Sequence, residues 1–283
     1  MRARRAAAAG LLLAALSVPA ARPAGAQEPD WLPSSKEYFW PLLADPTEPH
    51  YGVRLTMPAK RRRVGEIALG DTLGVYRFHS GATDVQLNLG GGVIGRFDVS
   101  KLTNDFQAAD FTFALPVDVH RGRHDLRLMY WHVSSHLGDD FIAHESPVLR
   151  KALTDELRWL YSFGPGRLRF YGGHAWAFSV SPHGSRRNRF HGGAEWSGRP
   201  FLNGRAHALL AGHLERLERA GPGLDLTLRA GVRVADEQRV GALTYFVEFF
   251  NGHLPYQQFT SRRETHGALG LRFEMGNPIR EPA

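Results

Sequence analysis

The sequence predicts an all-β protein: a single up-and-down antiparallel transmembrane β-barrel of about 12 strands that follows an N-terminal signal peptide. Three observations support this prediction. Apolar and polar residues alternate with period two in one segment after another, the segments are close to the length of a membrane-crossing strand, and the connections between them alternate between short and long. Each observation is typical of strands that cross a membrane within a closed sheet.

Period-two alternation is plainest in segment 224–234. Its leucines and valines fall on one face, and Asp225, Arg229 and Arg233 fall on the other. Because successive side chains of a strand point to opposite faces, strict alternation over this length favours a strand over a helix. The same reasoning predicts strands at 51–58, 65–78, 84–97, 107–118, 124–135, 153–162, 167–180, 189–197, 205–215, 224–234, 240–250 and 265–274.

Strand length separates a membrane barrel from a soluble sandwich. Strands of soluble domains usually have about 5–6 residues, whereas a tilted strand that crosses a bilayer needs about 9–11. Most of the expected strands have the length of a strand that crosses a bilayer. Their polar faces carry charges of both signs, and their apolar faces carry aromatic residues near the ends, as the lumen and the girdles of outer-membrane barrels do. A soluble periplasmic barrel or sandwich is the alternative.

The connections between the expected strands provide an independent test of the topology. Those after the second, fourth, sixth and tenth strands are short, and the one after the eighth is intermediate. Those after the third, fifth, seventh and eleventh strands are longer. Since transmembrane barrels have short periplasmic turns and longer outer loops, this alternation predicts an even strand count with both termini on the periplasmic side.

The two ends of the chain flank the expected barrel domain, 51–275. Residues 1–26 combine early arginines, a short apolar run and an Ala-Gly-Ala cleavage pattern, which together predict a signal peptide and export to the bacterial outer membrane. Residues 27–50 are rich in proline, which cannot donate to a strand ladder, so we expect a leader or a plug there. Residues 276–283 form a C-terminal tail.

Composition and context exclude several kinds of site. The chain has no cysteine, so it contains neither a disulfide nor a thiolate metal site. Removal of residues 1–26 takes away four arginines and no acid, so the formal charge falls from +7 to +3 and does not indicate a nucleic-acid partner. His174 and His191 lie in expected strands without an acid or nucleophile nearby, and we assign them no role.

The fifth expected strand ends in a dense polar cluster that holds the candidate site. Arg127 belongs in the polar lumen, so the opposite parity, which includes His132 and Ser134, faces outward near the outer rim. A histidine beside a serine can take the serine proton and make it a nucleophile. The next strand returns beside this one, and parity puts Asp155 on the same outer face, where it would orient the His132 ring.

Three acidic residues in the following connection leave alternatives open. Glu145 is a second candidate to orient His132. Asp139 and Asp140 could instead bind Ca²⁺, which favours carboxylate and carbonyl oxygens. In a purely structural interpretation, the same polar residues cap the strand and shape the loop.

The expected outer loops are rich in arginine. The guanidinium group matches phosphate well, and the outer leaflet is rich in lipid phosphates, so the loops are candidates to bind outer-membrane lipids or lipopolysaccharide. Solvated loops without a specific partner are the alternative. The residues are Arg61, Arg62, Arg63, Arg186, Arg187, Arg262 and Arg263.

Two strings of residues resemble a bacterial family. Residues 41–49, PLLADPTEP, and residues 132–140, HVSSHLGDD, are similar to the family catalogued as domain of unknown function 1207. The resemblance covers most of the chain after the signal peptide. It implies an outer-membrane-type barrel and no established activity.

A second resemblance is local. His132-x-Ser134 is similar to the His-x-Ser of outer-membrane phospholipase A and of the lipid A deacylase, in which the pair faces lipid. The resemblance implies that His132 is the base and Ser134 the nucleophile. Those families place a third residue, Asn or Glu, about twelve positions after the serine, where this chain has Glu145 and Ser146.

Two functions therefore follow as expectations. The first is a lipid acyl-ester hydrolase, or deacylase, with its His-Ser site at the outer rim. The second is a non-enzymatic barrel that acts as a narrow pore or as a structural, lipopolysaccharide-binding protein. The enzyme needs an outward site at the rim, and the pore needs an open lumen lined by Arg127, Arg158, Arg229, Arg233 and Arg272.

Overall fold

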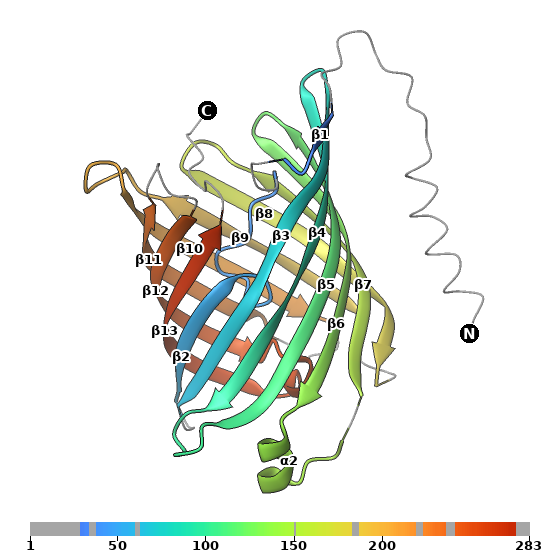
Figure 1. Ribbon diagram of the computed structural model, residues 1–283, viewed down its shortest axis with the longest axis vertical. Helices are drawn as coiled ribbons and strands as arrows, with labels where there is room; N and C mark the ends of the chain where they lie inside the picture. Colours follow the sequence, from blue (N-terminus) through green and yellow to red (C-terminus); the bar gives the residue numbers. More distant parts are fainter. Residues whose placement is uncertain are drawn as a thin grey trace, which may run out of the picture.

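The closed sheet is the organising feature of the structure. The computed structural model describes residues 29–33, 38–59, 63–149, 151–182, 187–218, 223–235 and 241–275. Within these residues, twelve antiparallel strands, β2 to β13, each pair with the next strand in the chain. Pairing of β13 with β2 closes the barrel (Figure 1). The predicted all-β, up-and-down barrel is confirmed.

The twelve strands of the wall overlap the twelve expected segments one for one. Their bounds are β2 Tyr51–Pro58, β3 Val64–Ser80, β4 Thr83–Asp98, β5 Asp105–Arg121, β6 His124–Leu137, β7 Ala152–Phe163, β8 Leu168–Ser181, β9 Asn188–Ser197, β10 Ala206–Leu217, β11 Asp225–Ala235, β12 Gly241–His253 and β13 Arg263–Met275. A short additional strand, β1 (Asp30–Trp31), pairs with β3. Two short helices, α2 (Asp139–Glu145) and η1 (Gln257–Phe259), lie in connections. No helix in the described part of the chain is both long and apolar enough to cross a membrane.

The two faces of the wall differ sharply in polarity. On β6 and β7, Leu128 and Leu157 face outward and are about half exposed, whereas Arg127 and Arg158 face the lumen and are buried. The outward positions of the other strands likewise carry large exposed apolar side chains. So wide an apolar surface is unfavourable in water and suits a hydrocarbon surrounding. The barrel is therefore of the outer-membrane type.

Paired charges fill the lumen. Glu248 Oε1 lies 2.6 Å from Arg54 Nη1, and Glu248 Oε2 lies 2.6 Å from Arg229 Nε. Asp118 Oδ1, on β5, accepts a hydrogen bond of 2.7 Å from Arg127 Nε on β6. A buried charge is unfavourable unless it is paired and hydrogen-bonded. The lumen-facing positions therefore carry acidic and basic side chains that neutralise one another.

Residues 38–50, the longer of the two described parts of the Pro-rich segment, lie inside the barrel, and we call them the plug (Figure 1). Leu42 is completely buried, and its carbonyl oxygen accepts a hydrogen bond from Arg272 Nη1 at 3.2 Å. The backbone N–H of Leu43 donates to Glu195 Oε1 at 2.6 Å. Side chains of the wall thus replace the ladder bonds that this proline-rich backbone cannot make.

The two ends of the barrel differ in their connections. At one end β3 and β4, and likewise β5 and β6, are joined by two-residue turns, in which Gly81 and Gly122 adopt a φ of +61° that glycine accommodates without strain. The other end carries the long connection between β6 and β7 with helix α2 (Figure 1). We call these the inner and the outer end. The difference agrees with the expected alternation of connections.

Candidate functional site

The predicted catalytic histidine and its acid meet on the outer wall of the barrel. In the register of β6 and β7, His132 lies directly opposite Asp155. His132 Nδ1 is 2.7 Å from Asp155 Oδ1. The side chains are 29% and 19% exposed, respectively, so both are partly desolvated but reachable from outside. Period-two parity on the two strands is what brings them to the same face.

A tyrosine on the same strand as His132 binds the Asp155 carboxylate. The hydroxyl of Tyr130 donates a hydrogen bond of 2.8 Å to Asp155 Oδ1. The Tyr130 ring packs edge-on against Phe113, with ring centroids 6.4 Å apart. An aromatic layer thus lies beside the polar cluster, as the girdle of an outer-membrane barrel would.

Ser134 shares the outer face with His132 but is not bonded to it. By register it lies between Phe111 on β5 and Leu153 on β7. At a rise of about 3.3 Å per residue, the Cα atoms of Ser134 and His132 are about 7 Å apart. No hydrogen bond joins the two side chains in the described part of the chain. The predicted nucleophile and the predicted base are therefore neighbours on one face of the strand that do not contact each other.

The contact between His132 and Asp155 is not by itself unusual, because other histidine–aspartate pairs of the barrel make similar contacts. His79 Nδ1 lies 2.6 Å from Asp84 Oδ1, and Tyr38, from the plug, donates to Asp84 Oδ2 at 2.8 Å. Burial and this hydrogen bond raise the pKa of Tyr38 to about 12. His120 and Asp125 form a similar contact of 2.6 Å. What sets His132 and Asp155 apart is their place on the outer wall beside a serine.

The acidic residues of the β6–β7 connection belong to helix α2, where the sequence suggested a loop. Asp139 and Asp140 occupy its first turn, a position where negative charge favours a helix. The backbone N–H of Phe106 donates to Asp140 Oδ2 at 3.3 Å. Glu145 ends the helix, is exposed and makes no hydrogen bond or ion pair with any other described residue. The Ca²⁺ site and the alternative orienting role stay predictions.

The described arginines of the predicted lipid contact lie at the outer end. Arg262 lies over the Phe259 ring at 4.6 Å, and Arg263 remains 43% exposed. Arg63 and Arg187 are exposed as well. The remaining predicted features fall outside the described residues: Arg61, Arg62, Arg186, the signal peptide 1–26 and the tail 276–283.

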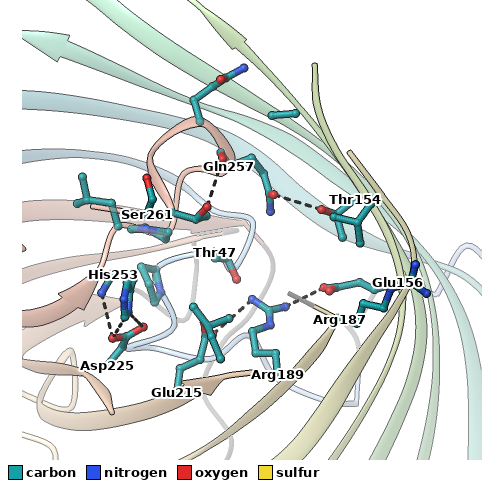
Figure 2. Close-up of a pocket in the computed structure, with 18 of the residues that line it drawn as sticks. Thr47, Thr154, Glu156, Arg187, Arg189, Glu215, Asp225, His253, Gln257 and Ser261 are labelled. Atoms are coloured by element: carbon teal, nitrogen blue, oxygen red, sulfur yellow. Dashed lines mark hydrogen bonds and ion pairs between the residues drawn. The ribbon is translucent and has the colours of Figure 1, made fainter. Parts of the chain in front are cut away.

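A chamber of about 380 Å³ lies in the lumen between the plug and the outer end. Figure 2 shows Thr47 of the plug on one side of it and Gln257 of the β12–β13 connection on another. Arg189 reaches across it, with Nη2 2.8 Å from Glu156 Oε1 and Nη1 3.4 Å from Glu215 Oε2. The charged residues that line the chamber are largely paired.

One group of potential metal ligands was missed by the sequence analysis. Asp45 of the plug, His191 of β9 and His213 of β10 are all buried, and one ligand atom from each lies within 4.8 Å of the others. It is the only such group of three among the described residues. Strand parity could have put the two histidines on the lumen faces of neighbouring strands, but nothing in the sequence pattern placed Asp45 beside them.

Comparisons with known proteins identify a family. The model of the family described as "Protein of unknown function (DUF1207)" matches residues 15–275. No curated protein matches the chain. Among solved structures, the translocator domain of the autotransporter NalP from Neisseria meningitidis is 12% identical with a TM-score of 0.35, over 82% of this chain and 91% of that one. CdiB from Acinetobacter baumannii is 12% identical with a TM-score of 0.32, over 78% of this chain and 59% of that one. At these TM-scores neither likeness carries an argument about function.

Proposed function

The chain belongs to the family of proteins of unknown function DUF1207, and from its own geometry we propose that it is a lipid acyl-ester hydrolase with its site on the outer wall of the barrel. Ser134 is the nucleophile, His132 the general base, and Asp155 the group that orients the imidazole. The observation that supports this proposal is the 2.7 Å contact between His132 Nδ1 and Asp155 Oδ1 on the outward face that also carries Ser134.

The contact at Nδ1 suits His132 to act as a base. A carboxylate that accepts the Nδ1 proton fixes the tautomer in which Nε2 carries a lone pair, and it stabilises the imidazolium that forms during reaction. Tyr130 donates to the same carboxylate, which limits its rotation. Catalytic hydrogen bonds are often long before substrate binds, so rotation of Ser134 towards Nε2 on substrate binding is part of the proposal.

The proposed reaction has two steps, acylation of Ser134 and hydrolysis of the acyl-serine. Ser134 Oγ bonds to the ester carbonyl carbon while His132 Nε2 takes the hydroxyl proton. The ester C–O bond then breaks, and the alcohol leaves with the proton from His132, which gives an acyl-serine. Water, deprotonated by His132, attacks the acyl-serine, and the fatty acid is released as Ser134 regains its proton.

The surroundings favour an ester of a membrane lipid as the substrate. Phe111, Phe113 and Leu157 border the polar cluster, and each is roughly half exposed on the outer wall. Acyl chains that lie along this apolar surface would bring the ester groups, which sit just above the hydrocarbon, to the level of His132. Exposed arginines at the outer end, Arg263 among them, offer partners for lipid phosphates.

The test is fatty-acid release by the refolded barrel. Phospholipid and lipid A are supplied separately in mixed micelles, with and without Ca²⁺, to wild type and to Ser134→Ala. The control is Ser135→Ala, because Ser135 neighbours Ser134 but faces the lumen, where it donates to Asp110. We expect release by wild type and by the control, and none by Ser134→Ala. Equal release by Ser134→Ala and wild type would refute the proposal.

The non-enzymatic alternative predicts different results. A structural or lipopolysaccharide-binding barrel would release no fatty acid from either lipid and would still bind lipopolysaccharide through its outer arginines. A narrow pore would need displacement of the plug, because wall residues such as Glu195 and Arg272 bind the plug backbone. Single-channel conductance separates these two forms of the alternative.

A further inference from the structure

We propose that Asp45, His191 and His213 bind a divalent transition-metal ion, best matched by Zn²⁺, which fastens the plug to the barrel wall. The three residues come from three separate segments: the plug, β9 and β10. One ligand atom from each lies within 4.8 Å of the other two, so a single ion can contact all three after small side-chain movements. The site lies inside the lumen and is separate from the outer-wall site of the proposed hydrolase.

Both histidines have buried ring nitrogens that lack a hydrogen-bond partner. His191 is 6% exposed, and neither of its ring nitrogens has a hydrogen-bond partner. His213 is 2% exposed, and its Nε2 also lacks a partner. A buried polar atom without a partner is unfavourable, and native structures contain few of them. A metal ion between the imidazoles would satisfy one nitrogen of each.

A tyrosine prepares His213 to be a ligand. The Tyr171 hydroxyl lies 2.9 Å from His213 Nδ1. When this hydroxyl accepts the Nδ1 proton, the lone pair of His213 is left on Nε2, which is the nitrogen without a partner. Gly193 allows the arrangement, because a Cβ there would lie 2.4 Å from the Tyr171 hydroxyl. Metal-bound histidines commonly have such a partner on the other ring nitrogen.

Asp45 supplies the negative charge that a dication requires. Thr47 donates two hydrogen bonds of 2.8 Å, from its N–H and its hydroxyl, and both reach Asp45 Oδ1. This leaves Oδ2 for the ion and fixes the carboxylate plane. Two arginines of the lumen, Arg158 and Arg189, both pair with Glu156. Asp45 makes no ion pair with a lysine or arginine among the described residues, so its carboxylate is available to a cation.

The ligand set favours zinc over the common hard cations. Two imidazoles and one carboxylate suit Zn²⁺, whereas Ca²⁺ and Mg²⁺ prefer oxygen ligands throughout. Three protein ligands leave at least one position for water. The 380 Å³ chamber is lined by His213 and by Thr47, so it adjoins the site and has room for a metal-bound water.

The consequence for the barrel is a cross-link between its plug and its wall. An ion that binds Asp45 together with His191 and His213 can bind fully only while the plug is seated. By mass action, binding then stabilises the seated state over any state with the plug displaced. Removal of the ion should loosen the plug without opening the wall.

The first experiment measures metal binding to the full-length barrel after refolding in detergent and treatment with chelator. Zn²⁺ is titrated calorimetrically, and Co²⁺ absorption reports the coordination geometry. The variants are Asp45→Asn, His191→Gln and His213→Gln, with Tyr171→Phe as a positioning variant. The control is His253→Gln, because His253 is also a buried lumen histidine but is bonded to Asp225 at 2.9 Å, outside the cluster. Far-UV circular dichroism and resistance to detergent unfolding establish that each variant is folded.

We expect wild type and His253→Gln to bind a single Zn²⁺ ion and to give the visible Co²⁺ bands of a tetrahedral site. The three ligand variants should lose both signals, and Tyr171→Phe should bind about 10–100-fold more weakly. Hydrogen exchange of residues 38–50 should slow when Zn²⁺ is added to wild type. The proposal would be overturned if the folded wild type takes up no Zn²⁺, or if the ligand variants bind Zn²⁺ as wild type does. It would also be overturned if the hydrogen-exchange rates of residues 38–50 are unchanged when Zn²⁺ binds. Ser134→Ala should bind Zn²⁺ normally, so failure of the hydrolase proposal would leave this result untouched.

Discussion

His132 Nδ1 lies 2.7 Å from Asp155 Oδ1 across the β6–β7 pair, on the outside of the barrel. Other histidine–aspartate contacts of similar length lie elsewhere in the barrel, for example between His79 and Asp84 at the inner end. The difference is one of surroundings. Among the histidine–aspartate contacts of the described residues, this one lies on the outer wall and shares its face with apolar side chains and with a serine two residues along the strand.

Substitution of Asp155 tests the orienting role. Asp155→Asn keeps the shape of the side chain but no longer holds the base tautomer of His132, so we expect fatty-acid release to fall by about 10²–10⁴-fold, the range of general acid–base catalysis. The rate is measured in mixed micelles at constant protein and lipid concentrations. Glu145→Gln in parallel distinguishes the two predicted orienting acids.

Asp84→Asn is the matched control for that experiment. It removes a histidine–aspartate contact that also has a tyrosine partner, Tyr38, but at the other end of the barrel. We expect Asp84→Asn to keep the wild-type rate. If Asp155→Asn and Asp84→Asn both retain the wild-type rate, Asp155 does not orient the base.

A charged residue introduced on the outer wall tests whether this surface lies in the hydrocarbon of the membrane. Leu128 is the fifth residue of β6, is about half exposed and faces outward. If this surface lies in hydrocarbon, Leu128→Arg should lower the free energy of unfolding in lipid vesicles by about 2–4 kcal/mol. The measurement is denaturant unfolding from vesicles. Leu102→Arg, at a fully exposed position of the β4–β5 connection, should have no comparable effect. Equal stabilities of the two variants would contradict a buried wall at Leu128.

Deletion of the plug tests what closes the lumen. Residues 38–50 bind wall side chains such as Glu195 and Arg272, so their removal leaves charged groups that water and ions would solvate. We expect wild type to be closed in planar bilayers and the deletion variant to conduct. Deletion of residues 29–33, which keeps the plug, is the control. A plugless barrel that stays as closed as wild type would show that the wall side chains fill the lumen alone.

The strands were predictable because their signal is local. Each strand alternates apolar and polar residues on its own, and one-to-one pairing of sequential strands follows from the short connections. Parity then placed Asp155 on the face of His132, and the structure puts the two residues opposite one another. The same logic placed Arg127 in the lumen, where it is buried and paired with Asp118.

The features that were missed depend on contacts far apart in the chain. Helix α2 lies within a connection that has no long apolar periodicity, so the sequence suggested only a loop. Asp45 lies in a Pro-rich segment with no strand period, and its position beside His191 and His213 is set by how the plug seats in the lumen. Alternation fixes which face a strand residue occupies, but it does not fix where a segment without strand structure comes to rest.

Covalent labelling of Ser134 tests whether this residue is the nucleophile of the proposed hydrolase. A fluorophosphonate lipid analogue is added to the refolded barrel, and peptide mass spectrometry locates the modified residue. The proposed function predicts that Ser134 is the labelled residue and that labelling falls sharply in His132→Ala, because the base that activates Ser134 is gone. Absence of label from Ser134, or equal labelling of Ser134 in wild type and His132→Ala, would contradict it.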